Sequence, residues 1–223
     1  MLAAYDGRTW IDWSWVNDHG SDIIERSREH VILLGWSMLF ALIVAIPLVL
    51  ISLRRRRVYA GVLVVTGILY TIPSLAAFAL LLPYTRLSRT TAIIPLAAYA
   101  LLILVRNIVT GLEQVPAEVQ DAAVGLGYSP ARKLLRVDLP LALPTIFAGI
   151  RIAVVTIIGL IPVSALIGQG GLGQLMTDGL QRDFRTPLIV GLVLTVVLAL
   201  AADLLLLGIQ RLLTPWTRKA ARA

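Results

Sequence analysis

The chain has 223 residues, of which 58% are hydrophobic and only 15% are charged, and its formal net charge is +7. A chain with so few polar residues cannot cover a hydrophobic core with polar surface, which excludes a soluble globular domain. An all-α, polytopic membrane protein is predicted instead. The absence of cysteine excludes disulfides, thiolate metal sites and cysteine nucleophiles. His19 and His30 have no ligand partner at metal spacing, which favours solvated histidines over a metal site.

The first segment, residues 1–30, is polar and precedes the first apolar run. Its tryptophans Trp10, Trp13 and Trp15 are followed by Ile23 and Ile24 among charged residues, a pattern typical of an interfacial amphipathic helix. A membrane-surface anchor explains this pattern without a ligand role. The apolar run behind it is too long for a cleavable signal, so we expect an uncleaved, extracytoplasmic N-terminal segment.

Five apolar runs approach or exceed the roughly 20 helical residues that cross a bilayer. The predicted spans are Val31–Leu53, Val58–Leu82, Thr91–Val105, Ile146–Ile167 and Pro187–Leu213. The third is short and can continue through Val109. Together they form one transmembrane domain, residues 31–213, followed by a basic tail, residues 214–223.

The distribution of Lys and Arg predicts the orientation. With the N-terminus outside, thirteen of the twenty Lys and Arg residues fall on the inner side, in agreement with the positive-inside rule. We therefore expect a multi-pass protein of a cytoplasmic membrane whose C-terminus is cytosolic. The excess positive charge is explained by this topology and by anionic membrane lipid rather than by nucleic acid.

Prolines within the spans mark candidate positions for a pathway. Each removes a backbone hydrogen bond, which a membrane protein tolerates beside other protein or a water-filled cavity. Pro73 and Pro162 are the two that we expect near such a pathway. For Thr71 and Ser74, hydrogen bonding to the backbone freed by Pro73 and lining of the pathway both remain open.

The polar connection of about residues 110–145 carries the strongest local signals. Pro116 can start a helix, and Glu118 and Asp121 place negative charge in its first turns. Ala122 and Ala123 favour the helix, and Gly127 ends it.

A second short helix, residues 131–137, is predicted directly afterwards, because Ser129 followed by Pro130 is typical of a helix N-cap with proline at the first helical position. Leu139 and Pro140 then precede the fourth span.

The glycine run after the fourth span satisfies the GxGxxG spacing at Gly168, Gly170 and Gly173. A dinucleotide site would need a preceding soluble strand, whereas this run follows an apolar span, so the nucleotide interpretation is rejected. Together with Gly171, these glycines allow a close backbone turn at the outer mouth. An extracellular gate and a plain turn remain open.

Asp203 is the only carboxylate deep in a predicted span. A carboxylate is expensive in hydrocarbon, so it should face the bundle interior. We favour an interhelical polar contact over proton coupling.

Three of these segments resemble known transport proteins. An acidic-Ala-Ala triplet followed after three residues by glycine, and later by Leu-Pro, resembles the EAA loop of ABC importer membrane subunits. The resemblance implies a cytoplasmic loop that docks into an ATPase subunit, although Asp121 stands where the family usually has Glu. The coupling residues that it implies are Glu118, Asp121, Ala122, Ala123, Gly127, Leu139 and Pro140.

The segments TIPSLA (71–76) and GQGGLG (168–173) are similar to permeases for glycine betaine, carnitine and choline. This resemblance implies the type I importer fold and alternating access. It also implies three kinds of partner: ABC ATPase subunits, an extracytoplasmic substrate-binding protein and a second permease, either identical or related.

Neither Lys133 nor Lys219 lies in a GxxxxGK[ST] motif, so ATP and Mg²⁺ are expected on the partner ATPase, with no cofactor and no enzymatic activity in this chain. Two alternatives remain: a permease for amino acids such as methionine, and a secondary transporter. The latter is disfavoured by the single deep carboxylate and the lack of a visible repeat.

Overall fold

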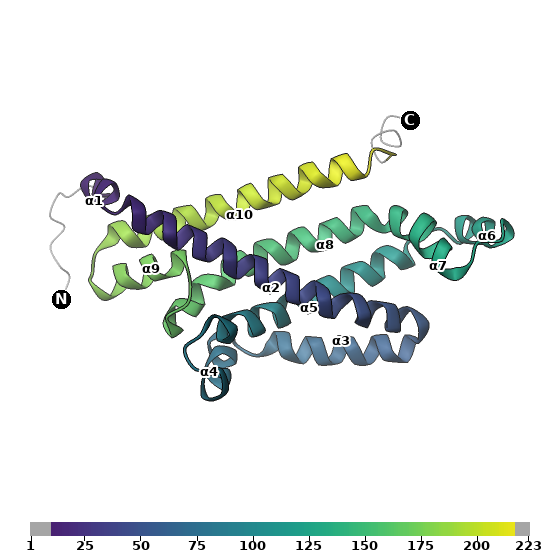
Figure 1. Ribbon diagram of the computed structural model, residues 1–223, viewed down its shortest axis with the longest axis horizontal. Coiled ribbons are helices and arrows are strands. Elements are labelled where there is room, and N and C mark those ends of the chain that lie inside the picture. The colour runs from purple at the N-terminus through teal and green to yellow at the C-terminus, as the bar shows by residue number, and fades with distance from the viewer. Residues whose placement is uncertain (1–9, 217–223) are drawn as a thin grey trace.

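The computed structural model describes residues 10–216, so the first nine residues and most of the predicted basic tail lie outside the described part. The described chain is helical throughout (Figure 1). Its elements are α1 (Trp13–Asp18), α2 (Gly20–Arg54), α3 (Arg56–Thr71), α4 (Ser74–Thr85), α5 (Arg89–Glu113), α6 (Ala117–Gly125), α7 (Pro130–Lys133), a π-helical turn η1 (Leu134–Asp138), α8 (Leu139–Leu160), a 3₁₀ helix η2 (Ile161–Ile167), α9 (Leu172–Gln181) and α10 (Arg185–Leu213).

Within residues 10–216, four helical stretches are long and apolar enough to cross a membrane: α2, α5, the stretch Pro130–Ile167, and α10. The pair α3 and α4 passes the same test together but is bent by 93°. If that pair is one span, the total is five, as predicted.

The first span begins earlier than predicted. Residues 20–30 continue without a break into α2, which has 35 residues and is therefore about 52 Å long at 1.5 Å per residue. That exceeds the roughly 30 Å of hydrocarbon in a bilayer, so part of α2 extends beyond it. The expected interfacial helix is thus reduced to the short α1.

The second span is not the straight helix that the apolar run suggested. The α-helix ends at Thr71, Ile72 and Pro73 have extended backbone, and α4 begins at Ser74. Because proline disfavours helical backbone in the residue before it, the break falls at Ile72.

The predicted second loop helix is not separate from the fourth span. Helix α7 begins at Pro130 as expected, with the Ser129 hydroxyl capping the Arg132 N–H, but it runs through η1 directly into α8. The fourth candidate span therefore reaches back into the polar connection.

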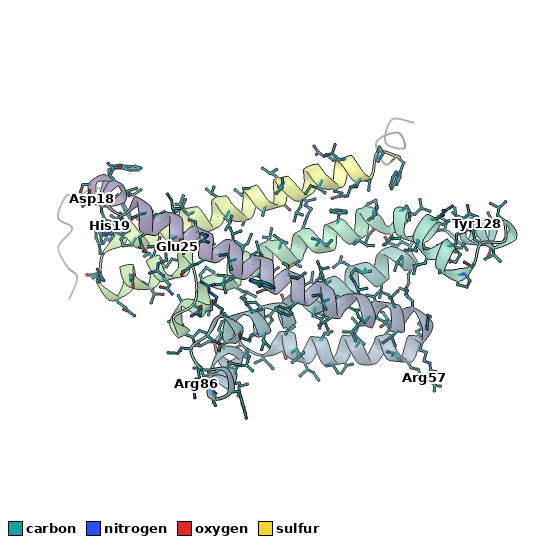
Figure 2. All side chains as sticks on the ribbon, in the orientation of Figure 1. Asp18, His19, Glu25, Arg57, Arg86 and Tyr128 are labelled. Carbon is teal, nitrogen blue, oxygen red and sulfur yellow. The ribbon has the colours of Figure 1, made fainter. Side chains whose placement is uncertain are left out.

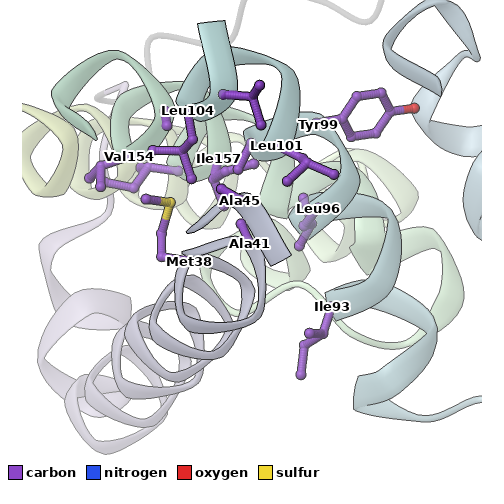
Figure 3. Close-up of a cluster of buried hydrophobic side chains, with 14 of the residues drawn as sticks. Met38, Ala41, Ala45, Ile93, Leu96, Tyr99, Leu101, Leu104, Val154 and Ile157 are labelled. Carbon is purple, nitrogen blue, oxygen red and sulfur yellow. The ribbon is translucent and has the colours of Figure 1, made fainter. Parts of the chain in front are cut away.

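The core surrounds α5, which packs against α8 and α2. Figure 3 shows side chains from these three helices meeting there. Four small residues at i, i+4 spacing, namely Ala41, Ala45, Gly149 and Ala153, are buried in it. A Cβ on Gly149 would lie 2.3 Å from the Asn107 Cβ, so glycine lets α8 approach α5 closely. The small residues serve packing within this chain.

The two ends of the bundle differ. Helices α6 and α7 project from one end, where the α2–α3 turn also lies, whereas α1 and α9 lie at the other (Figure 1).

Candidate functional site

The projecting connection contains the helix that the sequence predicted. Helix α6 begins after Pro116 with Glu118 in its first turn. Gly127 adopts φ +75°, and its N–H donates to the Val124 carbonyl at 2.9 Å, which closes the helix. A Cβ at Gly127 would meet nothing within 4 Å, so the positive φ is what requires glycine.

The surface of α6 presents apolar side chains to the outside. Val124 is 61% exposed and Leu126 is 76% exposed, beside the exposed carboxylates of Glu118 and Asp121. Ala123 is buried. Apolar side chains at the tip of a polar connection fit the predicted docking role, which stays a prediction. The sequence reasoning singled out the carboxylates and alanines but missed Val124 and Leu126, although hydrophobic residues in a polar loop were a visible signal.

A polar cluster fixes this connection to the fourth span. The Lys133 Nζ donates to Gln120 Oε1 at 2.7 Å and lies 2.9 Å from Asp138 Oδ2. The Gln120 amide in turn donates to the Val115 carbonyl at 3.1 Å. These contacts join α6 to α7 and η1 and hold the connection as one unit. Sequence reasoning had assigned Lys133 no such role.

Leu139 and Pro140, which the resemblance placed in the coupling set, form the first turn of α8 directly after this cluster. Both are half-buried, and Leu139 packs against the main core. Their position fits the expected role of fixing the connection, and that role stays a prediction.

The break in the second span is stabilised by two side chains. The Thr71 hydroxyl donates to the Ile68 carbonyl at 2.7 Å, as the backbone-bonding alternative expected. The Tyr99 hydroxyl of α5 donates to the Ile72 carbonyl. Thr71 and Pro73 are also exposed and Ser74 is half-buried, so a pathway role for this segment stays a prediction.

The glycine run joins η2 to α9, and three of its glycines lie against other backbone segments. A Cβ added to Gly170 would lie 2.5 Å from the Ala165 N, and a Cβ added to Gly171 would lie 2.6 Å from the His30 N. A Cβ added to Gly173 would lie 2.3 Å from the Pro162 Cα. These glycines are therefore required by close packing.

Gly168 is required for a different reason, since it adopts φ +73° with open space around it. The run follows a helix rather than a strand, which agrees with rejecting the nucleotide site. An extracellular gate at this run stays a prediction.

His30 was expected to be solvated, and the structure shows that this expectation is wrong. Its side chain is fully buried beneath the glycine run, whereas His19 is exposed at the end of α1. Among the described residues no group of three or more His, Cys, Asp or Glu could hold a metal ion.

Asp203 forms an interhelical ion pair between α8 and α10. The Arg151 Nε and Nη2 donate to Asp203 Oδ1 and Oδ2, each at 2.7 Å. The favoured interhelical contact is thus present, but its partner was missed, because Arg151 was one of the thirteen Lys and Arg residues assigned to the inner side. The positive-inside bias persists without it.

We had expected Asp203 to face the interior of the helix bundle. In the structure, the ion pair lies at the surface of this chain instead. The side chains are 25% exposed for Arg151 and 29% for Asp203. They border a groove of about 570 Å³ between α8 and α10. The groove is lined by Ala148, Arg151, Ile152, Val155, Thr156, Ala199, Leu200 and Asp203.

Residues 37–219 match the family described as "Binding-protein-dependent transport system inner membrane component". The chain belongs to this family. It is 34% identical to the choline transport system permease protein OpuBD of Bacillus subtilis (strain 168), over 92% of this chain and 91% of that protein. It is 33% identical to the carnitine transport permease protein OpuCD of Listeria monocytogenes serotype 1/2a (strain 10403S), over 94% of this chain and 93% of that protein.

Among solved structures, the permease resembles the MetNI methionine ABC transporter in an inward-facing conformation, with a TM-score of 0.77 and 22% identity. The match covers 88% of this permease and 98% of that chain. Identity at this level shows the fold alone, which is that of a type I importer transmembrane domain. The expected fold class is therefore confirmed, and family membership favours the importer over the secondary transporter.

The N-terminal part of the permease, outside the matched residues, is attached to the start of α10. The Asp12 N–H donates to the Thr186 hydroxyl at 2.9 Å, and Trp15 contacts Phe184 edge-on at 5.9 Å between ring centroids. The Asp12 carboxylate caps α1, and hydrogen bonds, first from the Ser14 hydroxyl and then from the Trp15 N–H, lower its pKa. Helix α1 is thus fixed to the bundle.

Proposed function

We propose that this chain is the permease subunit of an ATP-driven, binding-protein-dependent importer for quaternary-ammonium osmoprotectants such as glycine betaine, choline and carnitine. The observation that carries the proposal is its similarity, over more than nine-tenths of its length, to permeases named for choline and carnitine. The methionine alternative is supported only by the likeness to MetNI, whose identity of 22% speaks for the fold and not for the substrate.

In this proposal a partner protein, and not this chain, hydrolyses ATP. ATP and Mg²⁺ bind to separate ATPase subunits, and this chain has no cofactor of its own. A substrate-binding protein delivers the substrate from outside, and a second permease, identical or related, completes the pathway. The family description, a membrane component of binding-protein-dependent systems, supports these partners.

The exposed surface of α6 is the proposed docking site for the ATPase. Exposed Val124 and Leu126 offer apolar contacts, and the Asp121 carboxylate offers charge. Because α6 is joined through Lys133 to the helix that continues into α8, displacement of α6 would be carried into the spans. That connection supports the proposed mechanism of alternating access.

The proposed orientation has the N-terminus outside and the C-terminus in the cytosol. The charge distribution supports this orientation. Arg57, in the first turn of α3, lies at the same end of the molecule as Tyr128 of the polar connection (Figure 2). Asp18 and His19 lie at the opposite end.

Cysteine labelling tests the orientation, since the natural chain has no cysteine. With an impermeant thiol reagent, Thr177→Cys should react in intact cells and Ser129→Cys only after lysis. Labelling of position 129 from outside would overturn the orientation and with it the docking role.

Reconstitution tests the proposed activity. The permease is assembled with its ATPase and binding protein in liposomes, and ATP hydrolysis and uptake are measured. Glycine betaine, choline or carnitine should stimulate hydrolysis and accumulate inside only when ATP is present. Stimulation by methionine but by none of the three amines would assign the permease to amino-acid import instead.

A further inference from the structure

The ion pair between Arg151 and Asp203 lies at a depth where a membrane contains hydrocarbon. Asp203 is about 15 Å from the Leu213 end of α10 and about 27 Å from the Arg185 end, at 1.5 Å per residue. Arg151 is about 18 Å from the start of α8 at Leu139. Both side chains nevertheless remain about a quarter exposed.

Lipid tails are an unfavourable neighbour for this pair. Ionised side chains inside a membrane generally face protein or a water-filled cavity, because hydrocarbon offers them no solvation. The face of α10 pointing away from the groove, for example at Leu205, is purely apolar and suits lipid. The groove therefore differs in character from the rest of the exposed surface of α10.

The groove has the size and the chemistry of a site for a small polar molecule. Its volume of about 570 Å³ lies within the range of about 300–1,000 Å³ typical of ligand pockets. Apolar side chains, including Ile152, Val155 and Leu200, form most of its wall, and charged groups converge at one place. One molecule of osmoprotectant size fits such a space.

The ion pair leaves part of the hydrogen-bonding capacity of both side chains free. Arg151 donates through Nε and Nη2 to Asp203, and among residues 10–216 its remaining N–H groups have no other hydrogen-bond partner. A guanidinium fork with free N–H groups suits a carboxylate. The free lone pairs of the Asp203 carboxylate suit a cation that has no N–H to donate, such as a quaternary ammonium.

We infer that this groove lines the aqueous substrate route, and that Arg151 and Asp203 form in it a net-neutral binding site for a small zwitterion carrying a carboxylate and a quaternary ammonium. The carboxylate lies against Arg151 and the ammonium against Asp203, so that the two dipoles are antiparallel. This inference rests on the proposed function and adds a substrate contact inside the membrane. Because the site is neutral, it favours a zwitterion over a simple cation of similar size.

Accessibility of single cysteines tests where the groove faces. Leu200→Cys lies in the groove. Leu205→Cys is the control, on the same helix about 7.5 Å further along, and Leu205 is 66% exposed where Leu200 is 60% exposed. The probe is a trimethylammonium-ethyl methanethiosulfonate, applied to the complete transporter in liposomes. Leu200→Cys should react several-fold faster than Leu205→Cys, and glycine betaine with binding protein and ATP should slow that reaction.

Three results would overturn the inference. If neither cysteine reacts and oxidation cross-links Leu200→Cys to a second permease, the groove is a subunit contact. If neither reacts and none cross-links, lipid covers it. If Leu200→Cys reacts but glycine betaine gives no protection, the groove is wet but holds no substrate. Uptake by the unmodified transporter, measured in parallel, shows separately whether the proposed function itself holds.

Charge variants test the role of the pair in selection. Asp203→Asn leaves a positive site and should lower choline uptake more than glycine betaine uptake, whereas Arg151→Gln leaves a negative site and should shift the ratio the other way. If the ion pair is purely structural, each substitution should lower the uptake of choline and of glycine betaine to the same extent and leave the ratio of the two uptakes unchanged. An unchanged ratio would therefore exclude the site.

Discussion

Gly173→Ala tests whether the glycine run is held by close packing. The new Cβ would lie 2.3 Å from the Pro162 Cα and 2.5 Å from its carbonyl oxygen, more than an ångström short of ordinary contact and against backbone that cannot rotate away. Such overpacking costs about 3 kcal/mol at the upper end of the usual range. Alanine regains about 1 kcal/mol of helix propensity within α9, which leaves a net loss of about 2 kcal/mol.

The loss is measured as thermal unfolding of the purified permease in detergent, followed by the fluorescence of its five tryptophans. For a chain of this size, about 2 kcal/mol lowers the Tm by roughly 4–8 °C. Gly159→Ala is the matched control, because Gly159 is also helical, is exposed on α8, and a Cβ added to it would meet nothing within 4 Å. Its Tm should stay the same or rise. Equal Tm values for the two variants would refute the packing argument.

Three further substitutions address the docking connection and the broken span. Gly127→Ala forces a side chain into φ +75° and should cost about 1 kcal/mol, seen as a Tm lower by a few degrees, although no other part of the described chain lies within 4 Å of the new Cβ. Asp121→Lys reverses an exposed charge on α6, so uptake should fall while the Tm and substrate capture by the binding protein stay unchanged; normal uptake would contradict the docking role. Tyr99→Phe leaves the Ile72 carbonyl without its donor and should cost about 0.5–1.5 kcal/mol, and an unchanged Tm would mean that this bond does not hold the bend.

The features that the sequence predicted well are governed by neighbouring residues. Pro116 before the helix, acidic residues in its first turn and Gly127 after it determine α6 within a dozen positions, and the structure shows that helix. The same holds for the cap at Ser129, whose hydroxyl accepts from the Arg132 N–H. Apolar run length likewise predicted where the candidate spans lie, because the bilayer thickness sets their length; the described residues contain four, or five if α3 and α4 form one span.

The features that were missed depend on residues far apart in the chain. The 93° bend is the exception, because the break at Ile72 follows from the neighbouring Pro73; run length alone does not show it, since apolar residues continue on both sides. Arg151 and Asp203 are 52 positions apart, and only the packing of α8 on α10 shows that they pair. The burial of His30 also follows from a distant segment, the glycine run that covers it.

The fold joins the two sites physically. Lys133 binds both Gln120 of α6 and Asp138 of η1, and the helix that begins at Pro130 continues through η1 into α8 as far as Leu160. That helix therefore has the docking connection at one end and Arg151 in its middle. Because Arg151 is bonded at both Nε and Nη2 to Asp203, α8 cannot rotate relative to α10 without stretching or breaking this pair. In the proposed mechanism, movement imposed at α6 would reach the groove through this continuous helix, and the ion pair is the contact that it would alter there.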